Sequence, residues 1–156
     1  METVHQFLVA GSDILVWNYC GISHAMADDL QVRNVKAFGK KTVMLLNQLK
    51  IGIVGCSGTG SPVIEQLKRL GVGTLVFVDP DFTDDVNVNR IVGSTREDAE
   101  KHTLKVEVMK RGVEEIGMGT QVITFARHVS ARDIAKELAD CDLLIGALTV
   151  PRAAIH

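Results

Sequence analysis

The chain has 156 residues, of which 46% are hydrophobic and 23% charged, so it can bury one core and is too apolar for a disordered protein. Its 17 Lys and Arg residues against 19 Asp and Glu give a formal net charge of -2, which offers no basic surface to a nucleic acid. Cys20, Cys56 and Cys141 form no C-x-x-C pair, which argues against a disulfide framework or a zinc site. Without a membrane-length apolar run or a signal-peptide pattern, we expect a cytoplasmic protein with no membrane partner.

Residues 1–28 are predicted to form an N-terminal extension or the end of an upstream domain. Two short apolar runs, at residues 7–10 and 14–19, flank a Gly-Ser-Asp turn, a pattern typical of a β-hairpin. Over residues 26–49 the apolar side chains follow helical spacing that is interrupted at Gly39. Two short helices are therefore predicted to lead into the main domain.

The main domain, residues 29–156, is predicted to have an α/β fold. Strand-like runs at residues 50–55, 74–78, 121–126 and 142–147 alternate with helical segments. The expected helices are residues 63–70 with Ser61 as N-cap and Gly71 at the end, residues 95–116 with a Thr95-x-x-Asp98 capping box, and a helix ending at Ala139 with a Ser130-x-x-Asp133 capping box. Because this order requires crossover connections, we expect a Rossmann-like, doubly wound, mainly parallel sheet that binds ligands at the C-terminal ends of its strands.

A loop of small residues, GCSGTG at residues 55–60, follows the first of these strands. Backbone N–H groups in such a loop can approach phosphate oxygens, and the following helix N-terminus adds partial positive charge. A tight turn that binds nothing is the alternative interpretation. Ser57 departs from the G-x-G-x-x-G fingerprint of dinucleotide enzymes, whereas Asp79 stands where a carboxylate commonly accepts ribose hydroxyls. The loop and Asp79 imply a nucleotide without identifying it.

Polar side chains after the second strand of this domain help to distinguish the possible nucleotides. They are Asp81, Asn87, Asn89, Arg90 and Lys105. Cations neutralise the charge of transferring phosphates, and a carboxylate can hold magnesium, so this set favours triphosphate chemistry over hydride transfer. Taken singly, each of these residues is also explained as an ordinary surface or loop residue.

Four ordered segments resemble the ThiF/MoeB/HesA family, the prokaryotic relatives of ubiquitin-activating enzymes. They are IGIVGCSGTGS at residues 51–61, LGVG at 70–73, VDPD at 78–81 and NVNR at 87–90. The resemblance extends over residues 29–152. It implies an enzyme that uses ATP and Mg²⁺ to adenylylate the C-terminal glycine carboxylate of a ubiquitin-like or sulfur-carrier protein, releasing pyrophosphate without a covalent nucleophile.

The same resemblance implies roles for individual residues. Gly55, Ser57, Gly58, Thr59 and Gly60 would surround the ATP phosphates, Asp79 would bind the ribose, and Asp81, Asn87, Arg90 and Lys105 would complete the nucleotide site. The segment RNVKAFG, at residues 33–39, resembles the family segment around an arginine that reaches into the partner's active site. Arg33 would therefore act across a homodimer, with Arg90 and Lys105 as the other catalytic residues. We assign no metal ligand.

The C-terminal part of the chain departs from the family pattern. Where the family has a Cys-Thr-Asp-like motif and then an arginine, this chain reads GALTVPR at residues 146–152, without a carboxylate. The family's further strands, carrier-binding loop and cysteine zinc site are also absent. We therefore expect a domain that is incomplete at its C-terminus, with the far edge of its sheet uncovered.

Two further functions stay open on the sequence alone. A nicotinamide or flavin oxidoreductase is compatible with the strand-loop-helix unit and Asp79, and a non-catalytic nucleotide-binding scaffold is compatible with the missing carboxylate. Cys56 is expected to fill the turn and not to act as a nucleophile, because no histidine lies near it in the sequence. Cys141 is expected in the core, and Trp17 and Tyr19 in the N-terminal hairpin.

Overall fold

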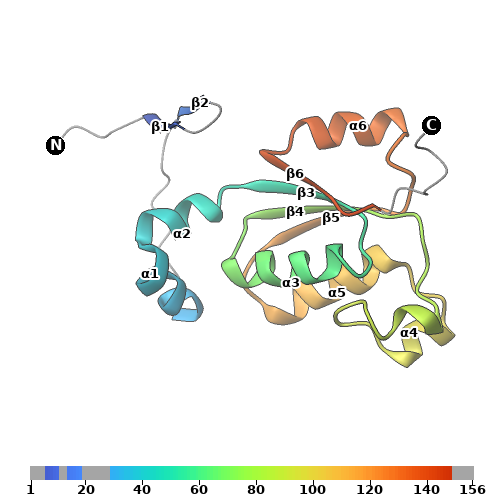
Figure 1. Ribbon diagram of the computed structural model, residues 1–156. Helices are drawn as coiled ribbons and strands as arrows, with labels where there is room; N and C mark the ends of the chain where they lie inside the picture. The colour runs from blue at the N-terminus through green and yellow to red at the C-terminus, as the bar shows by residue number, and fades with distance from the viewer. Residues whose placement is uncertain (1–5, 11–13, 19–28, 149–156) are drawn as a thin grey trace.

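The computed structural model describes Gln6–Ala10, Ile14–Asn18 and residues 29–148, and its centre is a four-stranded parallel sheet between two layers of helices (Figure 1). In spatial order the strands are β5 (Gln121–Phe125), β4 (Thr74–Val78), β3 (Lys50–Val54) and β6 (Leu143–Gly146). The helices α3 (Gly60–Leu70) and α5 (Lys105–Ile116) cover one face, and α6 (Arg132–Ala139) covers the other. The expected Rossmann-like, doubly wound α/β fold is confirmed.

The path of the chain through the sheet reverses beside β3. From β3 the chain passes outward to β4 and β5, and it then returns to the other side of β3 to form β6. In open parallel sheets, ligands bind beyond the carboxyl ends of the strands at such a reversal. A site is therefore expected at the C-terminal ends of β3, β4 and β6.

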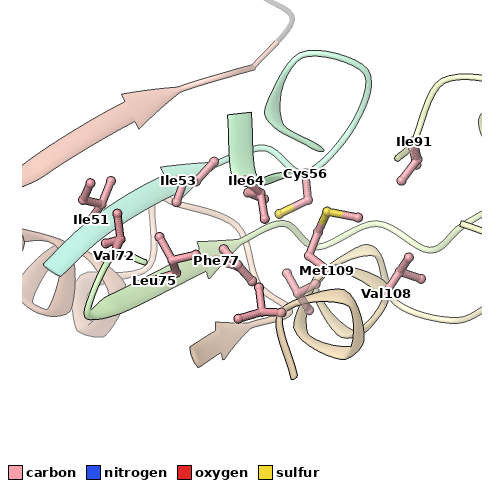
Figure 2. Close-up of a cluster of buried hydrophobic side chains, with 12 residues drawn as sticks. Ile51, Ile53, Cys56, Ile64, Val72, Leu75, Phe77, Ile91, Val108 and Met109 are labelled. Atoms are coloured by element: carbon pink, nitrogen blue, oxygen red, sulfur yellow. The ribbon is translucent and has the colours of Figure 1, made fainter. Parts of the chain in front are cut away.

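Hydrophobic side chains fill both sides of the sheet. Because alternate strand residues point to opposite faces, Ile53 and Phe77 pack toward α3 and α5, whereas Val76 packs toward α6. Figure 2 shows the first of these clusters, in which Ile64 and Met109, from the two covering helices, meet the side chains of β3 and β4. The continuous apolar runs of these two strands follow from burial on both faces.

The N-terminal elements also follow the expected pattern. Strands β1 (Gln6–Ala10) and β2 (Ile14–Asn18) pair antiparallel with each other and form a sheet separate from the main one. After the short 3-10 helix η1 (Asp29–Gln31), the helices α1 (Val32–Phe38) and α2 (Lys40–Leu46) are separated at Gly39, whose φ is 83°. The packing expected for Trp17 and Tyr19 lies outside what the structure describes.

The single helix expected over residues 95–116 is two helices, α4 (Arg96–Glu100) and α5. The Thr95 capping box at the start of α4 is confirmed, because the Asp98 N–H donates to Thr95 Oγ1 at 3.2 Å. The chain then turns, and Leu104 forms an isolated antiparallel bridge with Phe82, a residue far from it in the sequence. A long-range contact of this kind leaves no local periodic signal, so the prediction of one helix was wrong.

Two predicted helix caps are also wrong, because the side chains concerned have other partners. Helix α3 begins at Gly60, and the Oγ of Ser61 accepts a hydrogen bond at 3.0 Å from the Val92 N–H instead of capping the helix. At α6 the N-cap position is Ala131 without a side-chain cap, and Asp133 forms an ion pair with Arg127. The glycine expected to end α3 is confirmed, since Gly71 has left-handed backbone angles.

Strand β6 is less buried than its apolar sequence suggests. Leu143 and Leu144 are 48% and 50% exposed. Within the part of the chain that the structure describes, β6 pairs only with β3 and lies at one edge of the sheet. Among the described residues, the exposure of these two leucines reflects this edge position. None of the helices in the described residues is long and apolar enough to cross a bilayer.

Candidate functional site

The loop at residues 55–60 follows β3 and leads directly into α3. Gly55 has a φ of 99°, and a Cβ added there would lie 2.7 Å from the carbonyl oxygen of Ala147. At Gly60 an added Cβ would lie only 1.8 Å from the carbonyl oxygen of Gly55. Packing alone therefore explains the glycines at the two ends of the loop.

Gly58, in the middle of the loop, has no such packing constraint. It is exposed, and an added Cβ would meet only the side chain of Arg90, whose nearest carbon would be 3.5 Å away. Of its neighbours, Ser57 is half-buried and Thr59 is exposed. The Ser57 carbonyl accepts a hydrogen bond from the Ser61 N–H at 2.8 Å, in the first turn of α3. The loop thus presents an open backbone surface at a helix N-terminus, with the stem of Arg90 lying over it.

Asp79 joins this loop to the end of β4. Its side chain is buried, Oδ2 accepts from the Cys56 N–H at 2.7 Å, and Oδ1 accepts from the Asp81 N–H at 2.9 Å. Each carboxylate oxygen can accept a further hydrogen bond. Asp79 lines a hollow of about 210 Å³, which we call the Asp79 pocket, whose lining is Val54, Val78, Asp79, Pro80, Asp81, His128, Val129 and Leu148. Aliphatic walls beside a carboxylate suit a nucleoside.

A second hollow, of about 610 Å³, adjoins the Asp79 pocket at Pro80 and Asp81. We call it the cation hollow, and its lining is Pro80, Asp81, Phe82, Asp84, Asn87, Arg90, His102 and Lys105. It brings together four of the residues predicted from the sequence, namely Asp81, Asn87, Arg90 and Lys105. These residues come from the β4–α4 connection and the start of α5, so only the fold brings Lys105 close to the others.

Lys105 and Asp81 form an ion pair in the lining of the cation hollow. The Nζ of Lys105 lies 2.7 Å from Oδ2 of Asp81, and the Lys105 N–H donates to the Asp81 carbonyl at 3.1 Å. The lysine side chain is 7% exposed, whereas the aspartate side chain is 64% exposed. The cation is thus held in place by a carboxylate that remains accessible to solvent.

Asn87 shapes the turn that presents Arg90. It ends the 3-10 helix η2 (Asp85–Asn87), is buried, and its Oδ1 accepts from the Asp84 N–H at 3.2 Å. The Arg90 N–H in turn donates to the Asn87 carbonyl at 3.0 Å. Asn87 therefore has a clear structural role, and its contact with a triphosphate stays a prediction.

An ion pair behind this turn, with a buried carboxylate and a partly exposed guanidinium, was not anticipated from the sequence. The guanidinium of Arg111 makes two 2.7 Å hydrogen bonds to the carboxylate of Asp98, and a third, of 3.2 Å, to the carbonyl of Gly93. The Arg111 guanidinium holds the pKa of Asp98 well below its usual range, with smaller help from hydrogen bonds donated by Thr95. The capping box pointed to Asp98, whereas nothing in the sequence pattern distinguished Arg111.

His102 is a second residue of the site that sequence reasoning missed. It lines the cation hollow, and its Nδ1 lies 3.3 Å from Oδ1 of Asp84. No pattern in the sequence distinguished His102 from the other histidines. Among the described residues, no group of three or more His, Cys, Asp or Glu side chains could hold a metal ion. Thr149 and Arg152, in the segment that departs from the family, lie outside the described residues.

Arg33 is not brought together with the other predicted site residues in this chain. It is exposed on α1, beside Asn34, whose Nδ2 donates to the carbonyl of Arg69 at 2.8 Å. Arg69 lies near the C-terminal end of α3, and α1 lies beyond the N-terminal end of β3 (Figure 1). The cation hollow is at the opposite end of the sheet.

The two described cysteines have structural positions. Cys56 is fully buried and points into the core next to Ile64 and Met109 (Figure 2). Burial raises the pKa of its thiol, so the thiolate needed for nucleophilic attack is suppressed. Cys141 is partly buried against the cluster beneath α6. Both arrangements agree with the expectation that these cysteines serve packing.

Comparison with known proteins assigns the chain to a family. Residues 29–153 match the ThiF family. The chain belongs to the ThiF family. The adenylyltransferase and sulfurtransferase UBA4 of Meyerozyma guilliermondii is 32% identical over 118 residues, 75% of this chain and 27% of that protein. The sulfur carrier protein ThiS adenylyltransferase of Bacillus subtilis is 26% identical over 102 residues, 65% of this chain and 30% of that protein.

A solved structure supports the same fold. The Escherichia coli tRNA N6-threonylcarbamoyladenosine dehydratase, in complex with ATP, superimposes with a TM-score of 0.71 at 24% identity, covering 81% of this chain and 53% of that one. This ThiF-family chain thus spans about a third or less of the two curated relatives and about half of the solved structure.

Proposed function

We propose that this ThiF-family domain binds ATP along the C-terminal ends of β3 and β4 and adenylylates the C-terminal carboxylate of a ubiquitin-like or sulfur-carrier protein. The observation that carries the proposal is the junction of the Asp79 pocket with the cation hollow at Pro80 and Asp81. One end offers aliphatic walls and a carboxylate, and the other offers the cations of Arg90 and Lys105 beside two carboxylates. A nucleoside triphosphate has the matching arrangement of an apolar base, ribose hydroxyls and phosphates.

The nucleoside would occupy the Asp79 pocket. Val54, Val129 and Leu148 supply apolar contacts for a base, and the second lone pairs of the Asp79 oxygens can accept ribose hydroxyls. The protein's own N–H groups already orient that carboxylate on both oxygens. Little rearrangement is therefore needed for binding, which favours affinity.

The phosphates would lie across Gly58 and into the cation hollow. The backbone of the loop can approach them because Gly58 has no side chain, and Arg90 and Lys105 would neutralise their charge. A carboxylate that attacks the α-phosphorus forms a new P–O bond while the bond to the bridging oxygen breaks, giving an acyl-adenylate and pyrophosphate. Positioning and charge neutralisation are sufficient for this step, and the buried Cys56 takes no part in it.

Magnesium is proposed only as the ion that accompanies ATP. In proteins Mg²⁺ commonly takes most of its ligands from phosphate oxygens and water, with one or two carboxylates. The absence of a metal-ligand cluster among the described residues is compatible with this mode. We therefore expect ATP affinity to fall when the divalent ion is chelated.

Arg33 would act in this reaction from a second copy of the chain. Within one chain it lies at the opposite end of the sheet from Arg90 and Lys105. Helix α1 has no buried residue, and the large apolar side chains Leu30 and Phe38 around it are 61% and 53% exposed. A homodimer that covers this helix would satisfy both features, and sedimentation of the wild type and of Phe38→Glu tests it.

The proposal is tested by isothermal titration with ATP and magnesium, with NAD as the parallel ligand. Saturable ATP binding should be lost in Arg90→Ala and retained in Arg132→Ala, a matched change of an exposed arginine on α6. Asp79→Ala should also abolish binding, although it removes two hydrogen bonds of the fold as well. Binding of NAD without competition from ATP would support an oxidoreductase instead.

A tRNA substrate is the second candidate, because the solved structure with ATP is that of a tRNA-modifying dehydratase. A net charge of -2 offers little electrostatic attraction to a polyanion. We therefore expect no retardation of tRNA in a gel at physiological salt, and pyrophosphate release only with a carrier protein that ends in glycine. Retardation of tRNA with no response to carrier proteins would favour the second candidate.

A further inference from the structure

His102 has a backbone conformation that normally favours glycine. Its φ is 48°, and among the described residues it is the one non-glycine residue with a positive φ. The His102 N–H donates to the Ala99 carbonyl at 3.2 Å, and the Thr103 N–H donates to the Asp98 carbonyl at 2.9 Å. This hydrogen-bond pattern ends a helix with a left-handed residue, where a Cβ is disfavoured. Because the backbone favours glycine here, the presence of a histidine suggests that its side chain has a function.

The side chain of His102 lies on the cation hollow, where it has a carboxylate partner. Its imidazole is 69% exposed, and Nδ1 lies 3.3 Å from Oδ1 of Asp84. When Nδ1 donates to Asp84, the Nε2 atom of a protonated ring can donate to an anion in the hollow. Asp84 thus serves to orient the ring.

The charges around His102 leave a place for another cation. The charged side chains that share the hollow are Asp81, Asp84, Arg90 and Lys105, two acids and two bases that cancel. On the neighbouring residues, Lys101 is paired with Glu97 at 2.5 Å and does not line the hollow. Protonation of His102 would therefore make a neutral lining net positive.

We propose that His102 is a phosphate-binding residue whose protonated imidazole contacts the terminal phosphates of ATP, so that triphosphate binding strengthens as pH falls. The proposal rests on the proposed function, because it assumes that ATP phosphates occupy the cation hollow. It adds a third phosphate-binding side chain to Arg90 and Lys105. Binding of the nucleoside at Asp79 should not depend on the protonation of His102.

Titration of ATP and AMP into the wild type and three variants tests the proposal, at about pH 6 and about pH 8. His102→Gln removes the titrating group, and His102→Gly removes it while providing the residue that the backbone favours. Lys101→Gln is the matched control, because it removes a neighbouring charge outside the hollow. Since ATP itself titrates in this range, each comparison is the ratio of wild type to variant at one pH.

At about pH 6 both His102 variants should bind ATP roughly threefold to fivefold more weakly than the wild type, as expected for an exposed charged contact. The difference should disappear at about pH 8, AMP binding should be unchanged, and Lys101→Gln should follow the wild type. His102→Gly should be at least as stable as the wild type, so weaker binding cannot be ascribed to unfolding. Equal ATP affinity of the wild type and both variants at about pH 6 overturns the proposal, whereas a wild type that binds no ATP contradicts the proposed function together with it.

Discussion

The three glycines of the loop after β3 differ in what an added side chain would meet. Gly55 has a positive φ, and a Cβ at Gly60 would overlap a backbone oxygen, so the fold requires both. Gly58 satisfies no requirement of the fold, since an added Cβ would make only ordinary contact with Arg90. The glycine that packing does not explain is the one most informative about a ligand.

Replacing Gly60 and Gly58 by alanine should separate these reasons. Gly60→Ala should lower the free energy of unfolding by about 1–3 kcal/mol, because the loop must move to admit the methyl group. Gly58→Ala should change it by no more than about 0.5 kcal/mol, yet weaken ATP binding by crowding the phosphates. Urea unfolding and calorimetric titration of both variants measure the two effects. ATP binding that is unaffected by Gly58→Ala would leave the loop as a structural turn.

Cys56 should resist alkylation in the folded protein. Its thiol is fully buried and its pKa is raised by that burial, so raising the pH from about 7 to about 9 should not make it reactive. Mass spectrometry of the peptide after iodoacetamide treatment measures this, with urea-unfolded protein as the positive control. Cys56→Ala should keep ATP-dependent activity, and its complete loss in a folded variant would revive the nucleophile hypothesis.

At the scale of elements, the ion pair between Asp98 and Arg111 connects α4 to α5. Arg111 also connects both helices to the loop that runs from Arg90 to α4. Asp98 is almost fully buried on α4, whereas Arg111 on α5 is 40% exposed and also reaches the Gly93 carbonyl. The pair supports the segment from which Arg90 projects. Its effect on the site is therefore positional.

Asp98→Asn should destabilise the protein in a pH-dependent manner. The pKa of Asp98 is lowered by folding, so its stabilisation is present above the unfolded pKa, about 3.9, and is lost as pH falls through the folded pKa. We expect a cost of about 2–3 kcal/mol near pH 7, discounted for the exposure of Arg111, and a smaller cost near pH 3.

Urea unfolding at both pH values measures the effect of Asp98→Asn. The control is Glu97→Gln, which breaks an exposed pair with Lys101 and should leave the free energy of unfolding almost unchanged at both pH values. A cost of Asp98→Asn that is the same at both pH values would contradict the role assigned to the carboxylate charge.

At the scale of the whole molecule, the boundary expected near residue 29 is open to test. The β1–β2 pair is a sheet of its own, whereas Val43 and Met44 on α2 are buried. Deleting residues 1–28 should therefore leave the free energy of unfolding within about 0.5 kcal/mol of the full chain. A deletion extended through residue 46 should be destabilising, by several kcal/mol for the two lost side chains. Equal loss from both deletions would mean that residues 1–28 belong to the folded domain.

From the sequence, the alternation of strands and helices in the main domain could be predicted, apart from the break before α5, and several candidate site residues could be named. Continuous apolar runs marked β3 and β4 because both faces of these strands are buried, and Gly71 marked the end of α3 because few other residues adopt left-handed angles. The loop, Asp79 and Arg90 stood out because phosphate and ribose recognition needs those residue types after parallel strands. These signals are local, so they can be recognised in the sequence itself.

Which of these residues meet, and which local patterns are overridden, depends on contacts between distant segments. The break before α5, the Val92 partner of Ser61 and the Arg111 partner of Asp98 all depend on contacts between segments distant in the sequence. The same is true of His102, whose place on the cation hollow follows from the turn between α4 and α5. Local propensities amount to at most about 1 kcal/mol per residue, and a buried hydrogen bond or ion pair is worth as much or more, so the long-range contact prevails.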